Sequence, residues 1–446
     1  MSKTRVAIAC QGGGSQTAFT AGALKALCEA QIAQNFEIVS ISGTSGGAVC
    51  ASLLWYGYGR GDRPVWKRLI EFWKDNTAQG LAEQLFNDAI VTSLRLIDRG
   101  WLPSFQISPS SPLLSHAMKL LSAGVRPGFL EFPELLRKFI DFDEIARWGA
   151  RQEAPVLVVG AANITTGKLV KFMSNYAPIR LEHLLASCAV PTLFPAVMIE
   201  GQAYWDGLFS DNPPVEELVR PISVGDDNVP DEIWIIKINP TASHKVPLLP
   251  QEISDRRNQL EGNISLFQQL QHVEWINDVY LRGGLREDVF AHHGMKPPIR
   301  IPKAFADDPD KPFHIPWIEM PDALQDQLDY EGKLDRSARN IDWLVAEGEA
   351  SARDFLVRRA KLPPLPAGNS LEELVMMANH AARFFLVQPG SDPVPRVAEH
   401  FERFWGPDRR ARLVGHLAAG GAGLDEPVRE AAVLLANADR AGRPAS

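Results

Sequence analysis

The sequence predicts an α/β protein with a mostly parallel central sheet, and three observations indicate this class. Twice near the N-terminus a β-rich run ends in a glycine turn that leads into an apolar helical pattern. The runs are Arg5–Cys10 before Gly12–Gly14, and Glu37–Ile41 before Gly43–Gly47. A third, strongly apolar strand follows at Glu232–Ile238. Repeated strand–turn–helix units of this kind place their strands in parallel.

The elements between these strands fit the same class. Apolar residues recur at helical spacing over Gln16–Ala33, which predicts the first helix. Residues 58–150 contain amphipathic helical stretches without a convincing strand, so we predict a helical cap insertion there. The later elements are strands at Pro155–Ala161 and Leu169–Met173, a helix at Leu181–Ala189 and then a loop as far as Asp206.

The chain beyond residue 250 is predicted to be mostly helical. Long helices are expected at Gln251–Leu281 and Ser337–Lys361, with short strand-like pieces at Ile299–Ile301 and His314–Ile318. The predicted domains are a catalytic domain over residues 1–250, a helical extension over 251–361, a stiff Pro-rich linker over 362–370, and a helical C-terminal annex with a disordered tail over 371–446.

Composition excludes several classes of protein. The 446 residues include 46 Lys and Arg against 54 Asp and Glu, with no block of like charge, which argues against a nucleic-acid partner. The sequence has no apolar run long enough to span a bilayer, and we expect a cytoplasmic protein. The four cysteines lack the pair spacing of a zinc site and are expected to be free thiols: Cys10, Cys28, Cys50 and Cys188.

The most specific chemical motif is Gly43-Thr44-Ser45-Gly46-Gly47, a G-x-S-x-G between a strand and a helix. The tight turn needs its flanking glycines, Gly43 and Gly47, and presents the serine hydroxyl at the mouth of the sheet. The adjoining helix N-terminus supplies free N–H groups and the positive end of a dipole. We therefore expect Ser45 to be a nucleophile, although a purely structural turn has the same pattern.

A second glycine turn, formed by Gly12, Gly13 and Gly14, also lies between a strand and a helix. Backbone N–H groups in such a turn can bind an anion. A dinucleotide fingerprint is excluded because residue 17 is Thr and the second strand does not end in an acidic residue, and a P-loop lysine is also missing. An oxyanion hole for Ser45 fits better, and we expect neither a metal nor a cofactor.

The residue pattern is compatible with two kinds of general base for Ser45. Asp206-Gly207 is one candidate, although an Asp-Gly pair alone usually marks only a turn. A Ser-Asp-His triad of the α/β-hydrolase type would instead use a downstream histidine. The candidates for that role are His244, His272, His292 and His293. That fold usually places its serine after several strands, whereas Ser45 follows the second.

Taken together and in this order, Gly12–Gly14, Gly43–Gly47 and Asp206-Gly207 resemble the patatin-like phospholipase family. The stretches on either side of the Asp-Gly pair, Ala186–Pro195 and Ser210–Pro214, resemble segments of that family as well. Five matches in the right order are far more specific than any one of them.

The resemblance implies a three-layer α/β/α core and a Ser-Asp dyad. In that dyad Ser45 attacks the acyl carbonyl and Asp206 takes its proton directly, supported by Gly207. The Gly13 and Gly14 amides hold the oxyanion, and Gly12 shapes the loop.

The resemblance covers roughly residues 5–240, and the part after about residue 250 looks like the extension of a bacterial branch of the family. The annex beyond residue 371 resembles no family that we can name. One departure is Gln16-Thr17, because the family often has Arg or Lys followed by Gly at these positions.

The expected function is hydrolysis of phospholipid or other acyl esters, with peripheral and transient contact at a membrane surface. Trp101 and Phe105 in the cap insertion are candidates for that contact, although burial in a core is the commoner role for such residues. Two alternatives are hydrolysis of a storage polyester and a regulatory or scaffold role for a weakly active patatin-like body.

Overall fold

The structure is a computed structural model that describes residues 3–103, 108, 110–112, 116, 121–191, 193–243, 246–281, 315, 317–325, 327–360, 371–386 and 392–441. The chain divides into two compact units, Met1–Leu270 with Ile315–Lys361, and Gln271–His314 with Leu362–Ser446. The predicted strand at Ile299–Ile301 and the predicted linker at 362–370 lie outside the described residues.

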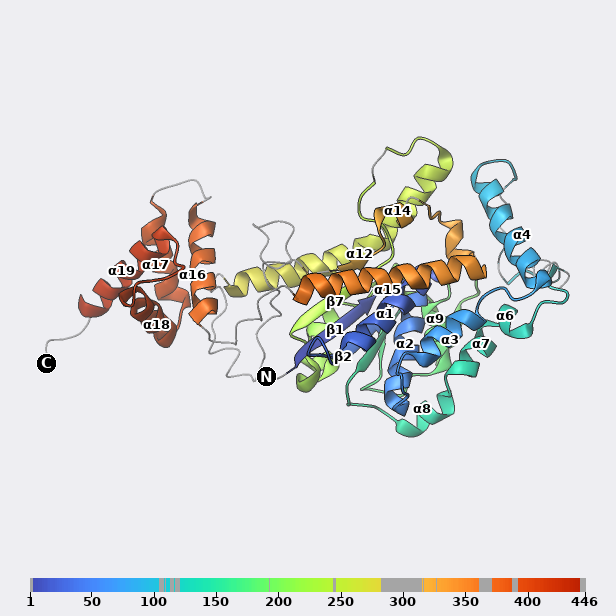
Figure 1. The fold of residues 1–446 in the computed structure, drawn as a ribbon, viewed down its shortest axis with the longest axis horizontal. Coiled ribbons are helices and arrows are strands. Elements are labelled where there is room, and N and C mark those ends of the chain that lie inside the picture. The colour runs from blue at the N-terminus through green and yellow to red at the C-terminus, as the bar shows by residue number, and fades with distance from the viewer. Residues whose placement is uncertain are drawn as a thin grey trace. The chain divides into compact units, whose positions relative to one another are not determined.

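A central sheet organises the first unit (Figure 1). Its strands are β1 (Thr4–Cys10), β2 (Phe36–Gly43), β3 (Val156–Asn163), β4 (Leu169–Met173), β5 (Val197–Ile199), β6 (Gln202–Asp206), β7 (Glu232–Lys237) and β8 (Trp317–Glu319). The order is β5-β6-β3-β2-β1-β7-β8, with β4 paired to β3. β1, β2, β3, β7 and β8 are parallel, whereas β4 and β6 are antiparallel to β3, and β5 is antiparallel to β6.

The central strands are buried because their sequences are apolar on both faces. Val6–Cys10 of β1 are inaccessible to solvent, and every residue of β3 and β7 is buried. Continuous apolar strands of this kind are typical of a parallel sheet covered by helices on both sides. The mostly parallel sheet with its helices confirms the predicted α/β/α class.

Helices of the first unit pack around the sheet. Their bounds are α1 (Ala18–Ala30), α2 (Gly46–Arg60), α3 (Lys67–Asp75), α4 (Leu81–Asp98), α6 (Pro127–Leu130), α7 (Phe132–Phe139), α8 (Phe142–Trp148), α9 (Leu181–Ser187), α10 (Glu216–Val219), α11 (Pro221–Val224), α12 (Pro250–Leu281, whose last residues belong to the second unit), α14 (Asp322–Gln325) and α15 (Ala338–Ala360). α1, α2, α3 and α15 lie together beside the sheet in Figure 1. Within the described part of residues 58–150, the regular elements are all helices.

Two glycines bring α15 into close contact with α1. A Cβ on Gly22 would lie 1.9 Å from the carbonyl oxygen of Val345, and one on Gly348 would lie 2.0 Å from that of Phe19. The two helices therefore pack backbone against backbone. Residues 315–361 are thus an integral part of the unit that holds the sheet, and they add β8 to its edge.

The segment before Asp206 differs from the predicted loop. It forms a hairpin in which β5 and β6 are joined by Glu200 and Gly201, both with positive φ, of 50° and 77°. Such a two-residue turn has the twist that a tight hairpin needs. The sequence signal was weak because Glu, unlike Asn or Asp, seldom occupies the first turn position. Asp206 is therefore the last residue of a strand.

The second unit contains a small helical core. Its helices are α16 (Leu371–Leu386), α17 (Pro393–Phe404), α18 (Pro407–Ala418) and α19 (Glu426–Ala441). Their buried side chains form one apolar cluster, in which the tilted rings of Phe401 and Trp405 pack with centroids 4.4 Å apart. The end of the predicted disordered tail, residues 442–446, lies outside the described residues.

Candidate active site

Ser45 lies on a sharp turn between β2 and α2. Its φ of 54° and ψ of −130° are unusual for a residue with a side chain. A Cβ on Gly43 would lie 2.5 Å from the carbonyl oxygen of Gly47, and one on Gly47 would lie 2.3 Å from that of Cys10. The two glycines are therefore required for the close approach of backbone around the serine, as expected of a nucleophile elbow.

Hydrogen bonds from neighbouring segments hold this turn in place. The Ser45 N–H donates to Ser187 Oγ at 3.0 Å, and the Ser187 hydroxyl donates to the Gly160 carbonyl at 2.7 Å. The Thr44 hydroxyl donates to the Asp211 carbonyl at 2.5 Å. The strained backbone of Ser45 is thus fixed by β3, by α9 and by the loop after Asp206.

The glycine turn after β1 presents two unused amides. The Gly12 N–H donates to Asn212 Oδ1 at 2.7 Å, so this amide is committed to the loop itself. No described residue accepts a hydrogen bond from the N–H of Gly13 or Gly14. A Cβ on Gly12 would lie 2.9 Å from the Ser45 Cβ, which places the turn directly beside the serine.

Asp206 ends β6 and lies next to the same turn. Its N–H donates to the Ala189 carbonyl at 2.9 Å, and its side chain is inaccessible to solvent. A Cβ on Gly207 would lie 2.5 Å from the Gly160 carbonyl oxygen and 2.8 Å from the Thr44 side chain. A larger residue at 207 would push Asp206 away from the serine turn, so only glycine permits this approach.

The Asp206 carboxyl group has one satisfied oxygen and one open oxygen. Oδ1 accepts the Leu208 N–H at 2.8 Å, whereas buried Oδ2 has no hydrogen-bond partner among the described residues. Burial raises the pKa of Asp206 to about 7, and this rise is opposed by the hydrogen bond from Leu208, by the nearby Ser45 hydroxyl and by the charge of Lys333. A carboxylate with an open oxygen and a pKa near neutrality can accept a proton at physiological pH.

Of the four histidines that could complete a triad, only His272 is among the described residues. His244, His292 and His293 lie outside the described residues, and the ring of His272 stacks on Trp275 in the second unit. A further histidine, His183, stacks on Phe172 with ring centroids 4.0 Å apart, and burial lowers its pKa to about 4. Its ring interacts with Arg180 rather than with the serine turn.

Gln16 and Thr17, where the sequence departs from the family pattern, are both buried in the loop. The Thr17 hydroxyl donates to the Gly14 carbonyl at 2.6 Å, and Gln16 Nε2 donates to the Asp329 carbonyl at 3.0 Å. Both residues therefore brace the glycine turn. The sequence did not reveal the supporting role of Ser187, Asn212 or Asp329, because nothing local marks a contact with a distant segment.

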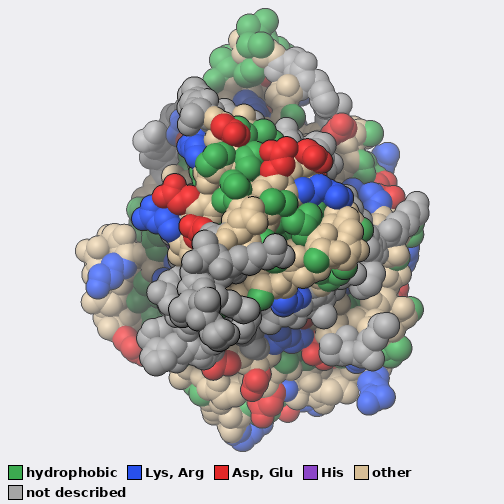
Figure 2. Space-filling model, turned by 90° about the vertical axis from the view of Figure 1, so that its left-hand side faces the viewer, with side chains coloured by type: hydrophobic (Ala, Val, Ile, Leu, Met, Phe, Trp, Pro, Cys, Tyr) green, Lys and Arg blue, Asp and Glu red, His purple; other side chains and the backbone are tan. Residues whose placement is uncertain are grey.

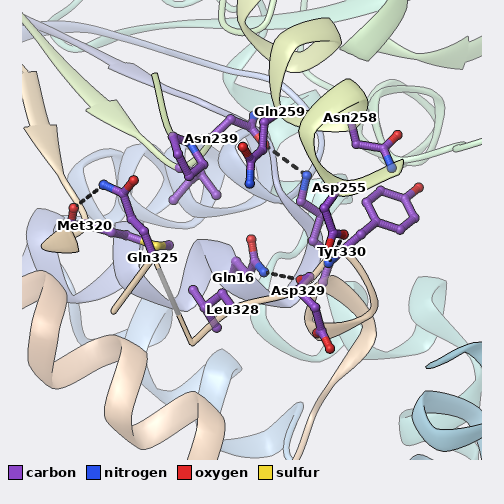
Figure 3. Close-up of a pocket in the computed structure, with 13 residues that line it drawn as sticks. Gln16, Asn239, Asp255, Asn258, Gln259, Met320, Gln325, Leu328, Asp329 and Tyr330 are labelled. Atoms are coloured by element: carbon purple, nitrogen blue, oxygen red, sulfur yellow. Dashed lines mark hydrogen bonds between the residues drawn. The ribbon is translucent and has the colours of Figure 1, made fainter. Parts of the chain in front are cut away.

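A polar pocket adjoins this brace (Figure 3). Asp255, Asn258 and Gln259 enter it from α12, and Gln16 and Asp329 face them from the opposite side. Asn239, Tyr330 and Lys333 complete its polar lining. The pocket includes neither Ser45 nor Asp206, so it is a neighbour of the serine turn rather than its cleft.

The described residues contain no group of three or more His, Cys, Asp or Glu side chains arranged to hold a metal ion. The four cysteines are free. The helices of the described ranges include none that is both long and apolar enough to cross a bilayer. Basic, acidic and hydrophobic side chains are interspersed on the face drawn in Figure 2, so that face is not uniformly charged.

Comparison with protein families finds two matches. The model of the family described as patatin-like phospholipase matches residues 8–219, and that of the NADH-dependent formate dehydrogenase delta subunit FdsD matches residues 373–432. The first match contains the two glycine turns, Ser45 and Asp206, and the second lies within α16–α19. No match was found among curated proteins.

Solved structures that resemble the chain have low identity. VipD from Legionella pneumophila is 13% identical, with 100% of this chain and 89% of that chain covered and a TM-score of 0.37. A chain of the heterodimeric ExoU–SpcU complex from the type III secretion system of Pseudomonas aeruginosa is 16% identical, with 99% and 76% covered and a TM-score of 0.24.

Proposed function

Residues 8–219 form a patatin-like phospholipase domain, and from that premise we propose that the protein hydrolyses carboxylic esters of lipids through Ser45 and Asp206. The match to the patatin-like phospholipase family supports the activity of a lipid acyl hydrolase. One observation above all supports a Ser-Asp dyad. The buried Oδ2 of Asp206 has no hydrogen-bond partner among the described residues, and the Ser45 hydroxyl lies near this carboxyl group. No histidine is needed between the two groups.

The proposed reaction proceeds in two steps. Ser45 Oγ attacks the ester carbonyl carbon while Asp206 Oδ2 accepts the hydroxyl proton. The carbonyl oxygen becomes an oxyanion that accepts hydrogen bonds from the free N–H groups of Gly13 and Gly14. When the tetrahedral intermediate collapses, the alcohol leaves with the proton from Asp206, and an acyl group remains on Ser45. Asp206 then deprotonates a water molecule that attacks the acyl carbon, the bond to Ser45 Oγ breaks to release the fatty acid, and the proton passes from Asp206 to Oγ.

We also propose that the protein works in the cytoplasm and contacts lipid surfaces peripherally, because phospholipid substrates reside in bilayers. Exposed apolar side chains occur close to Asp206 in the chain and in the sheet: Phe209 follows it by three residues, and Met198 lies on β5, the strand that pairs with β6. Trp101, a candidate from the sequence, is 75% exposed, whereas Phe105 lies outside the described residues.

The function is tested with purified full-length protein on soluble nitrophenyl esters of short and long acyl chains and on vesicles of defined phospholipids. Each substrate is assayed with and without a serine-directed fluorophosphonate. We expect release of free fatty acid that the fluorophosphonate abolishes. Complete absence of ester cleavage from every substrate would contradict the proposed function and favour the scaffold alternative.

Activity should depend on pH through Asp206. Since the carboxylate is the proton acceptor and its pKa is about 7, kcat/KM should fall about tenfold per pH unit below that value and level off above it. The measurement is a pH profile of kcat/KM on a short-chain nitrophenyl ester. A flat profile between pH 5 and 7 would contradict Asp206 as the base.

The glycine turn should tolerate no side chain at residue 14. Gly14 has a φ of +55°, and a Cβ there would lie 2.3 Å from the Lys333 carbonyl oxygen, so Gly14→Ala must displace the amide that would bind the oxyanion. We expect kcat to fall by about 10²–10³, the usual effect of losing one oxyanion donor.

The matched control is Gly61→Ala. Gly61 also has a positive φ, of 70°, but a Cβ there would meet no atom within 4 Å. This variant should keep normal kcat despite a modest loss of stability. Equal kcat for folded Gly14→Ala and the control would place the oxyanion hole elsewhere.

A side chain at Gly13 would meet a different obstacle from one at Gly14. The Gly13 φ of 177° is ordinary extended backbone that any residue adopts, so a side chain there would not strain the backbone. A Cβ on Gly13 would instead lie 2.5 Å from a methyl group of Ile238, which can move only in part. Gly14 is therefore the more informative position at which to test the proposed oxyanion hole.

A further inference from the structure

Asn212 links the glycine turn after β1 to helix α12, and its side chain is buried. Oδ1 accepts the Gly12 N–H at 2.7 Å, and Nδ2 donates to the Gly262 carbonyl of α12 at 3.1 Å. The first partner can only donate and the second can only accept, so these two contacts fix the orientation of the amide. An aliphatic side chain of the same size would satisfy neither group.

The backbone around Asn212 is tied to the other parts of the proposed catalytic machinery. This loop follows directly on Asp206, the proposed base. The Thr44 hydroxyl of the serine turn donates to the Asp211 carbonyl at 2.5 Å. The Asn212 N–H donates to Ser265 Oγ on α12 at 3.0 Å. Asn212 therefore lies where the segment with the base, the serine turn and the glycine turn are joined.

Gln11, the residue before the glycine turn, is anchored to the same part of α12. Its Nε2 donates to the Gly262 carbonyl at 3.0 Å and to Asn263 Oδ1 at 2.9 Å. Its Oε1 accepts the N–H groups of Ile238 and Asn239, just after β7, each at 2.8 Å. The start of the glycine turn is thus held between α12 and the end of β7, and the directions of the later amides depend on these anchors.

Gly12 is buried, and the next two amides of the turn are those left for an oxyanion. Without the acceptor on Asn212, rotation of the turn would have to supply the Gly12 N–H with another partner, because an unpaired buried donor is costly. We propose that Asn212 is a positioning residue for the hydrolysis: by holding the Gly12 N–H, it aims the next two amides at the oxyanion. This role rests on the proposed function. Its anchor, α12, lies beyond residues 8–219 that match the family.

The test compares two nitrophenyl esters that differ only in the atom that becomes the oxyanion. One is a short-chain ester, and the other is its thiono analogue, in which sulfur replaces the carbonyl oxygen. Sulfur is larger and a weaker hydrogen-bond acceptor, so aligned amides should favour the oxygen ester strongly. Both esters release nitrophenolate. The ratio of their kcat/KM values does not depend on the fraction of protein that is folded, so a purely structural defect should not change it.

Asn212→Ala should reduce this ratio by on the order of 10². A displacement of about 1 Å in a positioned group lowers the rate by that much, and only the oxygen ester loses the benefit of aligned amides. The thiono ester should keep its kcat/KM to within a few-fold. Asn212→Asp should keep the ratio as well, because its Oδ1 can still accept the Gly12 N–H although the contact with Gly262 is lost.

The matched control is Asn228→Ala. Asn228 is also buried, and its Nδ2 donates to the carbonyls of Gln152 and Val224, which belong to neither the glycine turn nor the serine turn. Loss of these bonds should lower Tm and leave the ratio unchanged. Circular dichroism establishes folding. If Asn212→Ala does not fold, Asn212→Leu, which keeps the volume of the amide without its polar atoms, provides the same comparison.

Two results would overturn the role of Asn212. One is an unchanged ratio in folded Asn212→Ala or Asn212→Leu, and the other is an equal fall of the ratio in Asn212→Asp. If turnover still depends on Ser45, either result leaves the proposed hydrolysis intact. Absence of any turnover that a fluorophosphonate blocks in the unaltered protein would contradict the hydrolysis and, with it, the role of Asn212.

Discussion

Ser45→Ala is expected to reduce kcat for ester hydrolysis by about 10⁵–10⁶, to the level left by the oxyanion hole and substrate binding alone. Ser45 lies on a strained turn with a φ of 54°, half-buried, beside the amides of Gly13 and Gly14 and the carboxyl group of Asp206. Alanine keeps the turn but removes the only atom that can form the acyl-enzyme. The measurement is the initial rate on a nitrophenyl ester and on phospholipid vesicles.

The control for this substitution is Ser52→Ala on the same helix, α2. The Ser52 hydroxyl is buried and has no hydrogen-bond partner among the described residues, so its removal should change neither kcat nor folding. Retained turnover in folded Ser45→Ala would show that another residue is the nucleophile.

Asp206→Asn is expected to lower kcat by on the order of 10⁴, the size of effect seen when a catalytic carboxylate becomes an amide. The amide oxygen can still accept the Leu208 N–H, which Oδ1 accepts at 2.8 Å, so the local geometry should persist. The proton acceptor is lost because the amide cannot take up the serine proton. Asp211→Asn is a matched control, since Asp211 lies in the same loop and forms an ion pair with Lys171 at 2.5 Å.

Histidine substitutions distinguish this dyad from a triad. Single His→Ala changes at His244, His272, His292 and His293 should each leave kcat within a few-fold of the unaltered protein, because Asp206 accepts the proton directly. His183→Ala should destabilise the fold through loss of its stacking on Phe172, with kcat of the folded fraction kept. One folded histidine variant as inactive as Ser45→Ala would establish a triad instead.

The sequence predicts the parts of this molecule that depend on local steric rules. Gly43 and Gly47 admit no Cβ, and Ser45 needs a positive φ, so strand, motif and helix could be placed from neighbouring residues alone. The buried strands β1, β3 and β7 follow equally directly from continuous apolar runs. The predicted bounds of these strands agree with those in the structure to within two residues at either end.

Contacts between segments that lie far apart in the sequence could not be predicted. The sequence predicts a loop in place of the β5–β6 hairpin, because the two strands are short and their turn contains Glu200. Nothing in the local sequence marks Ser187 as the acceptor for the Ser45 N–H, or Lys333 as a neighbour of Gly14 across more than three hundred residues. Such contacts are specified by the whole fold and have no short sequence signature.

The most direct test of the account is to identify the residue that reacts with a fluorophosphonate. The full-length protein is labelled at pH 8, digested, and analysed by tandem mass spectrometry, with Asp206→Asn treated in parallel. We predict a single adduct on Ser45 in the unaltered protein and much slower labelling of the same residue in Asp206→Asn. An adduct on a different serine, with Ser45 unlabelled while esterase activity is lost, would contradict the assignment of Ser45 as the nucleophile.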